Sequence, residues 1–314
     1  MMNRLIEMIE QAQSIAILGH TKPDGDCVGS CLGLYNYIRD NYGDKEVVVY
    51  LEELPKSFGF LAGADKVVHE YEDRIYDLGV SLDCSDTDRH VKFGPIFKDA
   101  KATACIDHHK SNAGFGDFFL CEPDVSSACE VLYKLLDDSL INHGCAEALY
   151  LGIVHDTGVF KYQSTSPETM RIAGALMSKG LDTQKIIDDT FYKVSYNQNL
   201  LTGYALLHSK LFLDGRLVMT KLEPEDFERF GAGKDDTEGI VDKIRVTEGT
   251  EVAVFAYRLP CKDYKFSLRS IKKVDVSLIG LHFSGGGHIR AAGFNAKEFE
   301  PAFETVLKMV EEQL

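Results

Sequence analysis

The stretch "SIAILGHTKPDGDCVGS", residues 14–30, decides the fold of the first half of the chain. It passes from an apolar run into a loop that carries His20, Asp24 and Asp26, and then into a helix expected over about 29–40. A nearly continuous apolar strand followed by a helix is typical of a parallel sheet covered on both faces. Because the ligand crevice of such a sheet lies at the carboxyl ends of its strands, this loop is the first candidate for a functional site.

The same alternation continues through the first half. Apolar runs of β type occupy "EVVVYL" (46–51), "LGVSLDC" (78–84) and "ATACIDHH" (102–109), and a helical pattern covers about 127–137. Strands that alternate with helices form parallel sheets, because a helix returns the chain to the starting edge. We therefore predict an α/β fold whose N-terminal domain has a parallel sheet flanked by helices.

The second half follows a different pattern. Helical periodicity over about 168–208 precedes "KLFLDGRLVMT" (210–220), which is a hairpin with an Asp-Gly turn. A second strand pair is expected in "EVAVFAYRLPCKDYKFSLRS" (251–270), and a last helix from about Pro301. This order predicts a smaller C-terminal α/β domain.

The composition is that of a globular protein, with 45% hydrophobic and 26% charged residues. A length of 314 residues allows two domains, which we place at 1–188, including the first linker helices, and 189–314. The N-terminus reads as an amphipathic helix rather than a signal peptide, and no apolar run is long enough to span a bilayer. Eight cysteines without a C-x-x-C pair are expected to be free thiols.

Free thiols are typical of a reducing compartment, and neither a signal peptide nor a membrane span is expected. We therefore expect a cytoplasmic protein with no membrane partner.

The net charge of −15 restricts the partners further. Binding to long duplex nucleic acid requires a basic face that releases counterions, so such a partner is not expected. A short anionic ligand at one local site is compatible with the charge, because metal ions can supply the positive charge.

Side chains of the kind that bind metal ions occur in four separate segments. In chain order they are His20, Asp24 and Asp26; Asp83 and Asp86; Asp107, His108 and His109; and Asp156 in "LGIVHDTGVFKY" (151–162). Each group is expected directly after a strand, and parallel strands end at the same edge of a sheet. Taken singly, each segment is more often a solvated turn or a strand-end cap than a functional site. Their joint occurrence predicts that they converge on one crevice.

The donor types point to hard divalent cations. Several carboxylates in one place repel each other unless cations neutralise them. Carboxylate and imidazole without thiolate suit Mn²⁺ or Mg²⁺, and the ligands suffice for two ions. Two ions roughly 3.5–4 Å apart can hold a nucleophilic hydroxide and stabilise in-line displacement at phosphorus. The predicted chemistry is phosphoester hydrolysis.

A second candidate site is the stretch "FSGGGHIRAAGF" (283–294), which "FSLRS" (266–270) precedes in the chain. Consecutive glycines let backbone N–H groups approach an anion closely, and His288 and Arg290 beside them offer charge-assisted donors. A glycine run alone is more often a surface loop. The adjacent His and Arg favour phosphate or nucleotide binding instead.

With these motifs the chain resembles the DHH/DHHA1 phosphoesterase family, specifically its short two-domain branch of nanoRNase and pAp phosphatases and related cyclic-dinucleotide phosphodiesterases. The resemblance covers nearly the whole chain. Its five motifs, in order, are "GHTKPDGDCVGS" (19–30), "DCSDTDR" (83–89), "IDHHKSN" (106–112), "HDTGVFKY" (155–162) and "GGGHIRAAGF" (285–294).

The resemblance implies two manganese ions, or magnesium ions, in the first domain. Its ligands would be His20 and Asp24 for one ion, Asp26, His108 and Asp156 for the other, and Asp83 as the bridge. It implies catalytic roles for Asp83, His108 and His109, with His109 near the scissile phosphate. Asp107 is implied to orient the histidine after it. His155 departs from the family pattern, which has a small hydroxyl or apolar residue there.

In the second domain the resemblance implies a set of substrate-binding residues. They are Ser267, Arg269, Gly286, Gly287, His288 and Arg290. The implied domain closes over the crevice and holds the terminal phosphate and nucleotide of the substrate.

The activity that the resemblance implies is Mn²⁺-dependent hydrolysis of short oligoribonucleotides, pApA and 3′-phosphoadenosine 5′-phosphate (pAp). Four alternatives stay open: a cyclic-di-AMP phosphodiesterase, a single-strand exonuclease, an inorganic pyrophosphatase or exopolyphosphatase, and a nucleotide-binding sensor without catalysis. The expected partners are short RNA or adenine nucleotides as substrates. A homodimer is expected because it is the commonest assembly of soluble oligomers.

Overall fold

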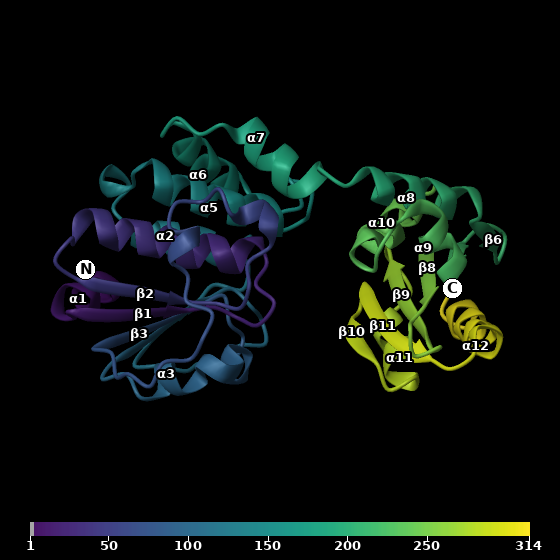
Figure 1. Ribbon diagram of the computed structural model, residues 1–314, viewed down its shortest axis with the longest axis horizontal. Helices are drawn as coiled ribbons and strands as arrows, with labels where there is room; N and C mark the ends of the chain where they lie inside the picture. Colours follow the sequence, from purple (N-terminus) through teal and green to yellow (C-terminus); the bar gives the residue numbers. More distant parts are fainter. Residues whose placement is uncertain (1–2) are drawn as a thin grey trace. The chain divides into compact units, whose positions relative to one another are not determined.

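The computed structural model describes residues 3–314, which divide into two compact units, Met1–Lys193 and Val194–Leu314. Each unit has a sheet of its own with helices against it (Figure 1). Within residues 3–314, no helix combines the length and the apolar character needed to cross a membrane.

The first unit is built on a five-stranded, fully parallel sheet with the order β2-β1-β3-β4-β5. Its strands are β1 (Ser14–Leu18), β2 (Glu46–Tyr50), β3 (Leu78–Leu82), β4 (Thr103–Asp107) and β5 (Phe118–Cys121). The first four match the apolar runs of the sequence, and β5 was not predicted. The α/β class and the parallel sheet are therefore confirmed.

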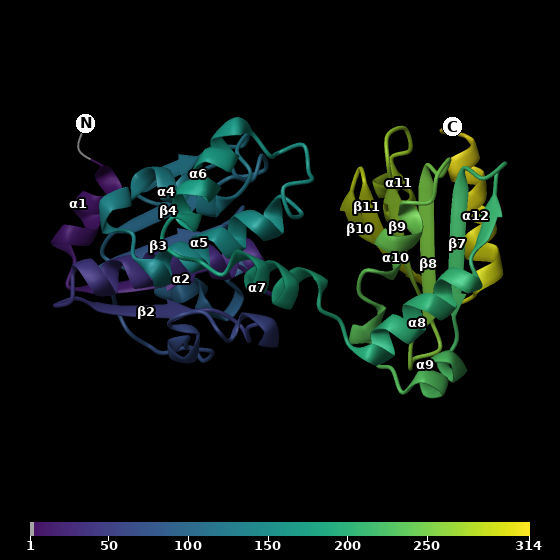
Figure 2. The same cartoon turned by 90° about the horizontal axis from the view of Figure 1, so that it is seen from above.

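Helices cover both faces of this sheet, as its continuously apolar strands require. They are α1 (Arg4–Gln11), α2 (Gly25–Asn41), α3 (Gly94–Lys98), α4 (Ala128–Leu135), α5 (His143–Asp156), α6 (Pro167–Met177) and α7 (Thr183–Ile187). Ile15 and Ile17 of β1 pack under α2, α4 and α5, whereas Ala16 and Leu18 pack on the face that carries α3. Figures 1 and 2 show α2 and α5 side by side over the sheet.

Short helical turns complete the first unit. They are the 3₁₀ turns η1 (Lys56–Phe58), η2 (Ala64–Lys66), η3 (Thr87–Phe93) and η4 (Asp138–Leu140), and the π-helical turn η5 (Asp188–Tyr192).

The second unit has a mixed six-stranded sheet with the order β10-β11-β9-β8-β7-β6. Its strands are β6 (Lys210–Phe212), β7 (Leu217–Leu222), β8 (Val252–Arg258), β9 (Tyr264–Ser270), β10 (Gly286–His288) and β11 (Ala291–Ala296). Only β7 and β8 pair in parallel among the strands of this sheet within residues 194–314. The predicted hairpin and the second strand pair are both present.

Two helical layers pack on this sheet. The helices are α8 (Tyr196–Leu207), α9 (Pro224–Phe230), α10 (Ile240–Arg245), α11 (Val276–His282) and α12 (Phe299–Glu311), with a 3₁₀ turn η6 (Asp235–Thr237). Alternate residues of β8 face opposite layers: Val254 packs with α11 and α12, and Phe255 with α8 and α10. Strand β9 is buried on the α11 and α12 side only, which leaves polar side chains on its other face.

Candidate metal centre

Asp24 shapes the loop between β1 and α2. Its side chain accepts the N–H groups of Asp26 and Cys27 at 3.1 and 3.2 Å and so caps the N-terminus of α2. The helix therefore begins at Gly25, earlier than the sequence predicted, and Asp26 lies in its buried first turn.

Asp26 is held at the N-terminus of a second helix. Its carboxylate accepts the backbone N–H groups of Ala128 at 2.6 Å and Cys129 at 2.9 Å, the first residues of α4. These donors and the positive helix end favour the ionised carboxylate. Burial and the charges of Asp83 and Asp156 outweigh them and raise the pKa of Asp26 well above its usual value. The carboxylate is thus rigidly placed but electrostatically unfavourable without a cation.

Asp83 directly follows β3 and is 2% exposed. Its φ of +55° is a left-handed conformation that costs a non-glycine residue about 1 kcal/mol or more and is concentrated at functional sites. The Oδ1 atom is buried and accepts no hydrogen bond from the residues that the structure describes. An unpartnered buried carboxylate oxygen is costly, and a bound cation would remove that cost.

His20 lies on one side of the Asp83 carboxylate. Its Nε2 atom is 3.4 Å from Asp83 Oδ2 and 3.7 Å from Asp24 Oδ1. Its Nδ1–H donates to the carbonyl of Thr21 at 2.8 Å, which leaves Nε2 facing the carboxylates. A backbone partner on one ring nitrogen is the usual arrangement for a metal-binding histidine.

His108 lies on the other side of the same carboxylate. Its Nε2 atom is 3.5 Å from Asp83 Oδ1, 3.4 Å from Asp156 Oδ2 and 3.7 Å from Asp26 Oδ2. Asp156 reaches this position from the C-terminal end of α5. The expectation that Asp156 follows a strand is therefore wrong, because the apolar run before it continues a long buried helix. The six predicted ligand residues nevertheless converge.

The electrostatics of the cluster are those of a site that needs positive charge. Burial raises the pKa of Asp156 to about 6, and the charges of Asp83 and Asp24 add to this effect. Burial by itself would lower the pKa values of the histidines. The carboxylates around them outweigh burial and raise the pKa of His108 to about 10 and that of His20 above its usual value. Protons therefore occupy the place that cations would take.

The donor set fits hard divalent cations, because it consists of carboxylate oxygens and imidazole nitrogens. Cys27 is a further neighbour, since its Sγ atom lies within 4.8 Å of ligand atoms of His20 and Asp83. Burial raises the pKa of this thiol well above its usual value, and Sγ accepts the backbone N–H of His20 at 3.2 Å. Cys27 thus packs beneath the site as a neutral thiol.

His109 is positioned by Asp107. Its Nδ1–H donates to Asp107 Oδ1 at 2.8 Å, and this bond is the main reason that the pKa of His109 is raised. The ring is 43% exposed, with Nδ1 3.6 Å from Asp83 Oδ1. The expectation that Asp107 orients the histidine directly after it is wrong, because the His108 ring turns toward the carboxylate cluster. Asn112 donates to Asp107 Oδ2 at 2.7 Å; the sequence reasoning missed it, although it ends the "IDHHKSN" motif.

His155 supports the metal-binding loop from behind. Its Nε2–H donates to the hydroxyl of Thr190 at 2.9 Å, and that hydroxyl donates to the carbonyl of Ile186. The ring lies so close to Gly25 that a Cβ atom there would be 2.3 Å from it. The departure from the family pattern at position 155 therefore explains the glycine between the two loop aspartates.

Asp86 does not join the cluster. Its side chain accepts the N–H groups of Asp88 and Arg89 at 3.0 and 3.2 Å and caps η3. The grouping of Asp86 with the metal-type side chains is therefore wrong, because an aspartate before a helical turn is satisfied by its backbone.

Two of the predicted substrate-binding residues lie on the polar face of β9. Ser267 and Arg269 alternate with the buried residues of the strand and are half-buried. Arg269 Nε is 3.5 Å from Asp242 Oδ1 of α10, and Ser267 pairs in register with Gly293 of β11. This face offers a cation and a hydroxyl to a ligand.

The glycine run forms an edge strand rather than a loop. Gly286 and His288 flank Gly287 in β10, which pairs antiparallel with β11. Gly287 has φ +141°, and a Cβ atom there would be 2.4 Å from the carbonyl oxygen of Ala291. Its glycine is therefore required by the hairpin itself. Gly286 faces open space, and His288 is exposed.

Arg290 is bound to the backbone of its own unit. Its guanidinium donates to the carbonyl of Val274 at 2.9 Å, to the hydroxyl of Ser270 at 3.4 Å and to the carbonyl of Lys272. These bonds fasten the turn after β9 to the start of β11.

The fold and the cluster together define the class of the protein. A parallel sheet whose strand ends gather carboxylates and imidazoles suited to divalent cations is the framework of a metal-dependent hydrolase. Comparison with known proteins agrees: the family model "DHH family, N-terminal domain" matches residues 14–153, and "DHHA1 domain" matches residues 214–314.

Individual relatives cover almost the full chain. The chain is 31% identical to the bifunctional oligoribonuclease and PAP phosphatase NrnA of Thermus thermophilus, over 96% of this chain and 90% of that protein. It is 25% identical to the Bacillus subtilis protein of the same name, over 96% and 95% of the two chains. A crystal structure of an exopolyphosphatase-related protein from Bacteroides fragilis superposes with a TM-score of 0.89 at 27% identity, covering 98% and 95%.

The chain therefore belongs to the DHH/DHHA1 family of phosphoesterases, which are metal-dependent hydrolases of phosphoester bonds. The resemblance drawn from the sequence motifs is confirmed.

Proposed function

We propose that the protein hydrolyses short 5′-phosphorylated oligoribonucleotides such as pApA, and also pAp, with two Mn²⁺ ions. The observation that carries this proposal is the position of Asp83, whose two carboxylate oxygens face two separate groups of donors. The names of the relatives, which describe an oligoribonuclease and PAP phosphatase, support the choice of substrates.

His20 and Asp24 would hold one ion, Asp26, His108 and Asp156 the other, and Asp83 both. When bound, the two ions supply an activated water and stabilise the charge that develops on the phosphorus oxygens. The protein contributes the placement of the ligands: Asp26 is fixed by two backbone N–H groups, and the backbone carbonyl of Thr21 orients the His20 ring.

His109 would act on the leaving group. The hydrogen bond to Asp107 raises the pKa of His109, which favours the protonated ring, and it holds the Nδ1–H in place. The Nε2–H is then free to donate a proton to the leaving oxygen. Asn112 keeps Asp107 in position, so the orientation of the acid does not depend on the substrate.

Ser267, Arg269 and the β10 segment with His288 would bind the terminal phosphate or nucleotide. Arg269 meets a single carboxylate, that of Asp242, at 3.5 Å, so its charge is only partly compensated. An arginine in this condition is suited to bind phosphate oxygens. For Arg290, binding of substrate would require the guanidinium to leave its backbone partners.

We also propose a cytoplasmic homodimer. All eight cysteines are free thiols, which fits a reducing compartment. Light scattering on the purified protein would measure the dimer directly.

The test is an assay of purified protein with Mn²⁺ on pApA, pAp, cyclic-di-AMP, pyrophosphate and long single-stranded DNA. We expect release of AMP from pApA and of phosphate from pAp. Failure to hydrolyse both would refute the proposal, and turnover of another member of the panel would identify which alternative holds. Tight binding of pApA without turnover would identify a sensor.

A further inference from the structure

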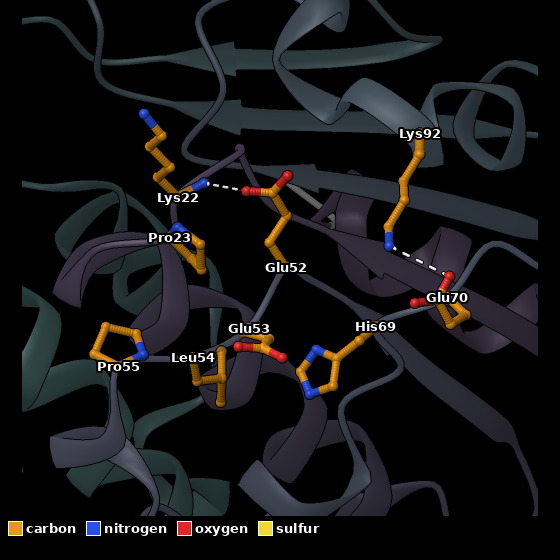
Figure 3. Close-up of a pocket in the computed structure, with 9 residues that line it drawn as sticks. All are labelled: Lys22, Pro23, Glu52, Glu53, Leu54, Pro55, His69, Glu70 and Lys92. Atoms are coloured by element: carbon orange, nitrogen blue, oxygen red, sulfur yellow. Dashed lines mark hydrogen bonds and ion pairs between the residues drawn. The ribbon is translucent and has the colours of Figure 1, made fainter. Parts of the chain in front are cut away.

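A groove of about 650 Å³ lies in the first unit outside the metal cluster. It is lined by Lys22, Pro23, Glu52, Glu53, Leu54, Pro55, His69, Glu70 and Lys92 (Figure 3). The volume is sufficient for a nucleoside, because ligand pockets begin at about 300 Å³.

The groove is attached to the metal-binding loop. Lys22 and Pro23 lie between the ligands His20 and Asp24, and Glu52 accepts the Thr21 hydroxyl and the Lys22 N–H at 2.8 Å each. Figure 3 shows the bond from the Lys22 N–H to Glu52 at one side of the groove.

The position in the sheet leads to the same conclusion. The segment 52–55 follows the carboxyl end of β2, which pairs in parallel with β1, and β1 ends at the metal-binding loop. Neighbouring strands are about 4.8 Å apart, so the groove continues the crevice at the sheet edge by one strand. A group attached to a phosphate at the cluster can therefore extend into it.

The lining combines apolar surfaces with hydrogen-bond acceptors. Pro23 and Leu54 provide apolar contact, and Glu53 and His69 both line the groove (Figure 3). His69 donates its Nδ1–H to the carbonyl of Leu51 at 3.0 Å, which leaves Nε2 as an acceptor. Apolar walls with a few polar groups suit the ring of a nucleobase and its amino group.

The charges of the groove disfavour a second phosphate. Glu52 is bonded to the loop, and Glu70 is paired with Lys92 at 3.5 Å. Glu53 has no salt bridge among residues 3–314, and the lining contains three carboxylates but only the two ammonium groups of Lys22 and Lys92. The net charge of the lining is therefore negative, unlike that of a site for an internal, phosphorylated nucleotide.

We propose that this groove binds the nucleoside that keeps the scissile phosphate on its 5′ oxygen when the 3′ oxygen of the preceding nucleotide leaves, and that it selects such a nucleoside when it carries no further phosphate. This inference rests on the proposed function and adds to it a preference for the length of the oligonucleotide substrate. Among short oligoribonucleotides this favours dinucleotides, in which the chain ends at that nucleoside.

The test compares pApA with pApApA for the wild type and for Glu53→Lys, with Glu53→Gln as an intermediate. We expect the ratio of kcat/KM for pApApA to that for pApA to rise about five-fold in Glu53→Lys and about two-fold in Glu53→Gln, because repulsion of the extra phosphate is reversed or removed. The rise should shrink at high salt, where exposed charges are screened.

The matched control is Glu10→Lys, the same change at an exposed position of α1 outside the groove. It should leave the ratio unchanged, which separates a local effect from that of net charge. An unchanged ratio in Glu53→Lys, with pApA still hydrolysed, would overturn the subsite alone. Failure of the wild type to hydrolyse pApA would overturn the subsite, and failure on pAp as well would overturn the proposed function with it.

Discussion

The two candidate sites of this chain differ in how their side chains are held. In the metal cluster Asp26, His20 and His109 each have a fixed partner, and the charges face inward from a buried crevice. On the polar face of β9, Arg269 is half-buried and meets one carboxylate at 3.5 Å. The comparison shows that the polar side chains of the first unit are pre-organised by bonds within the protein, whereas those on the β9 face have weaker contacts.

The largest effect is expected for Asp83→Ala, because this residue serves both groups of donors. We expect kcat to fall by about a thousand-fold or more, with metal content reduced and circular dichroism unchanged. The control is Asp86→Ala, which removes only a cap and should cost about 1 kcal/mol of stability with little loss of activity. Equal losses in the two variants would show that Asp83 has no special place in the cluster.

A smaller effect is expected for His109→Asn, which removes the proposed acid and keeps the metal ligands. We expect kcat to fall by about a hundred-fold, with Mn²⁺ content unchanged by elemental analysis. A substrate with a good leaving group, such as a p-nitrophenyl ester, should lose much less. Loss of manganese would instead place His109 among the ligands.

Variants of two arginines in the second unit, Arg269 and Arg290, distinguish a role in substrate binding from a role in stability. Arg269→Ala should raise KM for pApA about ten-fold and leave the melting temperature nearly unchanged, because within residues 3–314 the side chain loses only a half-exposed ion pair with Asp242 and one hydrogen bond to the adjacent Leu268 carbonyl. A fall in melting temperature without a change in KM would assign Arg269 to structure.

Arg290→Ala is expected to act mainly on stability. It leaves the carbonyls of Val274 and Lys272 without their donor, which costs about 1–3 kcal/mol. We expect a lower melting temperature, weaker substrate binding as a consequence, and unchanged manganese. A KM effect at full stability would show that Arg290 contacts the substrate directly.

The smallest effect concerns pH in metal-free protein. Asp156, with a pKa of about 6, and His108, with a pKa of about 10, both bind protons more tightly when folded than when unfolded. Their contribution to stability is therefore present at low pH and is lost as pH rises, over about 4–6 for Asp156 and about 6.5–10 for His108. Added Mn²⁺ competes with these protons, so its gain in melting temperature should grow as pH rises from about 5 to 8. A gain independent of pH would argue against binding at these residues.

Much of this organisation was readable from residue patterns because the patterns are local. The apolar runs that became β1, β3 and β4 are buried on both faces, and the edge strand β2 is buried at its carboxyl end, so their composition identifies them. The short strand β5 was not found, because its apolar run "FFLC" is only four residues long and is only partly buried. Asp86 was wrongly grouped with the metal-type side chains, because an aspartate that caps a helical turn and an aspartate that binds a metal ion look alike in sequence.

The sequence by itself determined the family, the parallel sheet and the identity of the side chains that meet at its edge, because ordered motifs and apolar periodicity are properties of the chain alone. Only the tertiary structure decided that Asp156 arrives on a helix, that Asp107 orients His109, that His155 packs against Gly25, and that Arg290 is bound to backbone carbonyls. Each of these depends on contacts between segments distant in the chain or on the direction in which a side chain turns. A pattern of residue types carries neither.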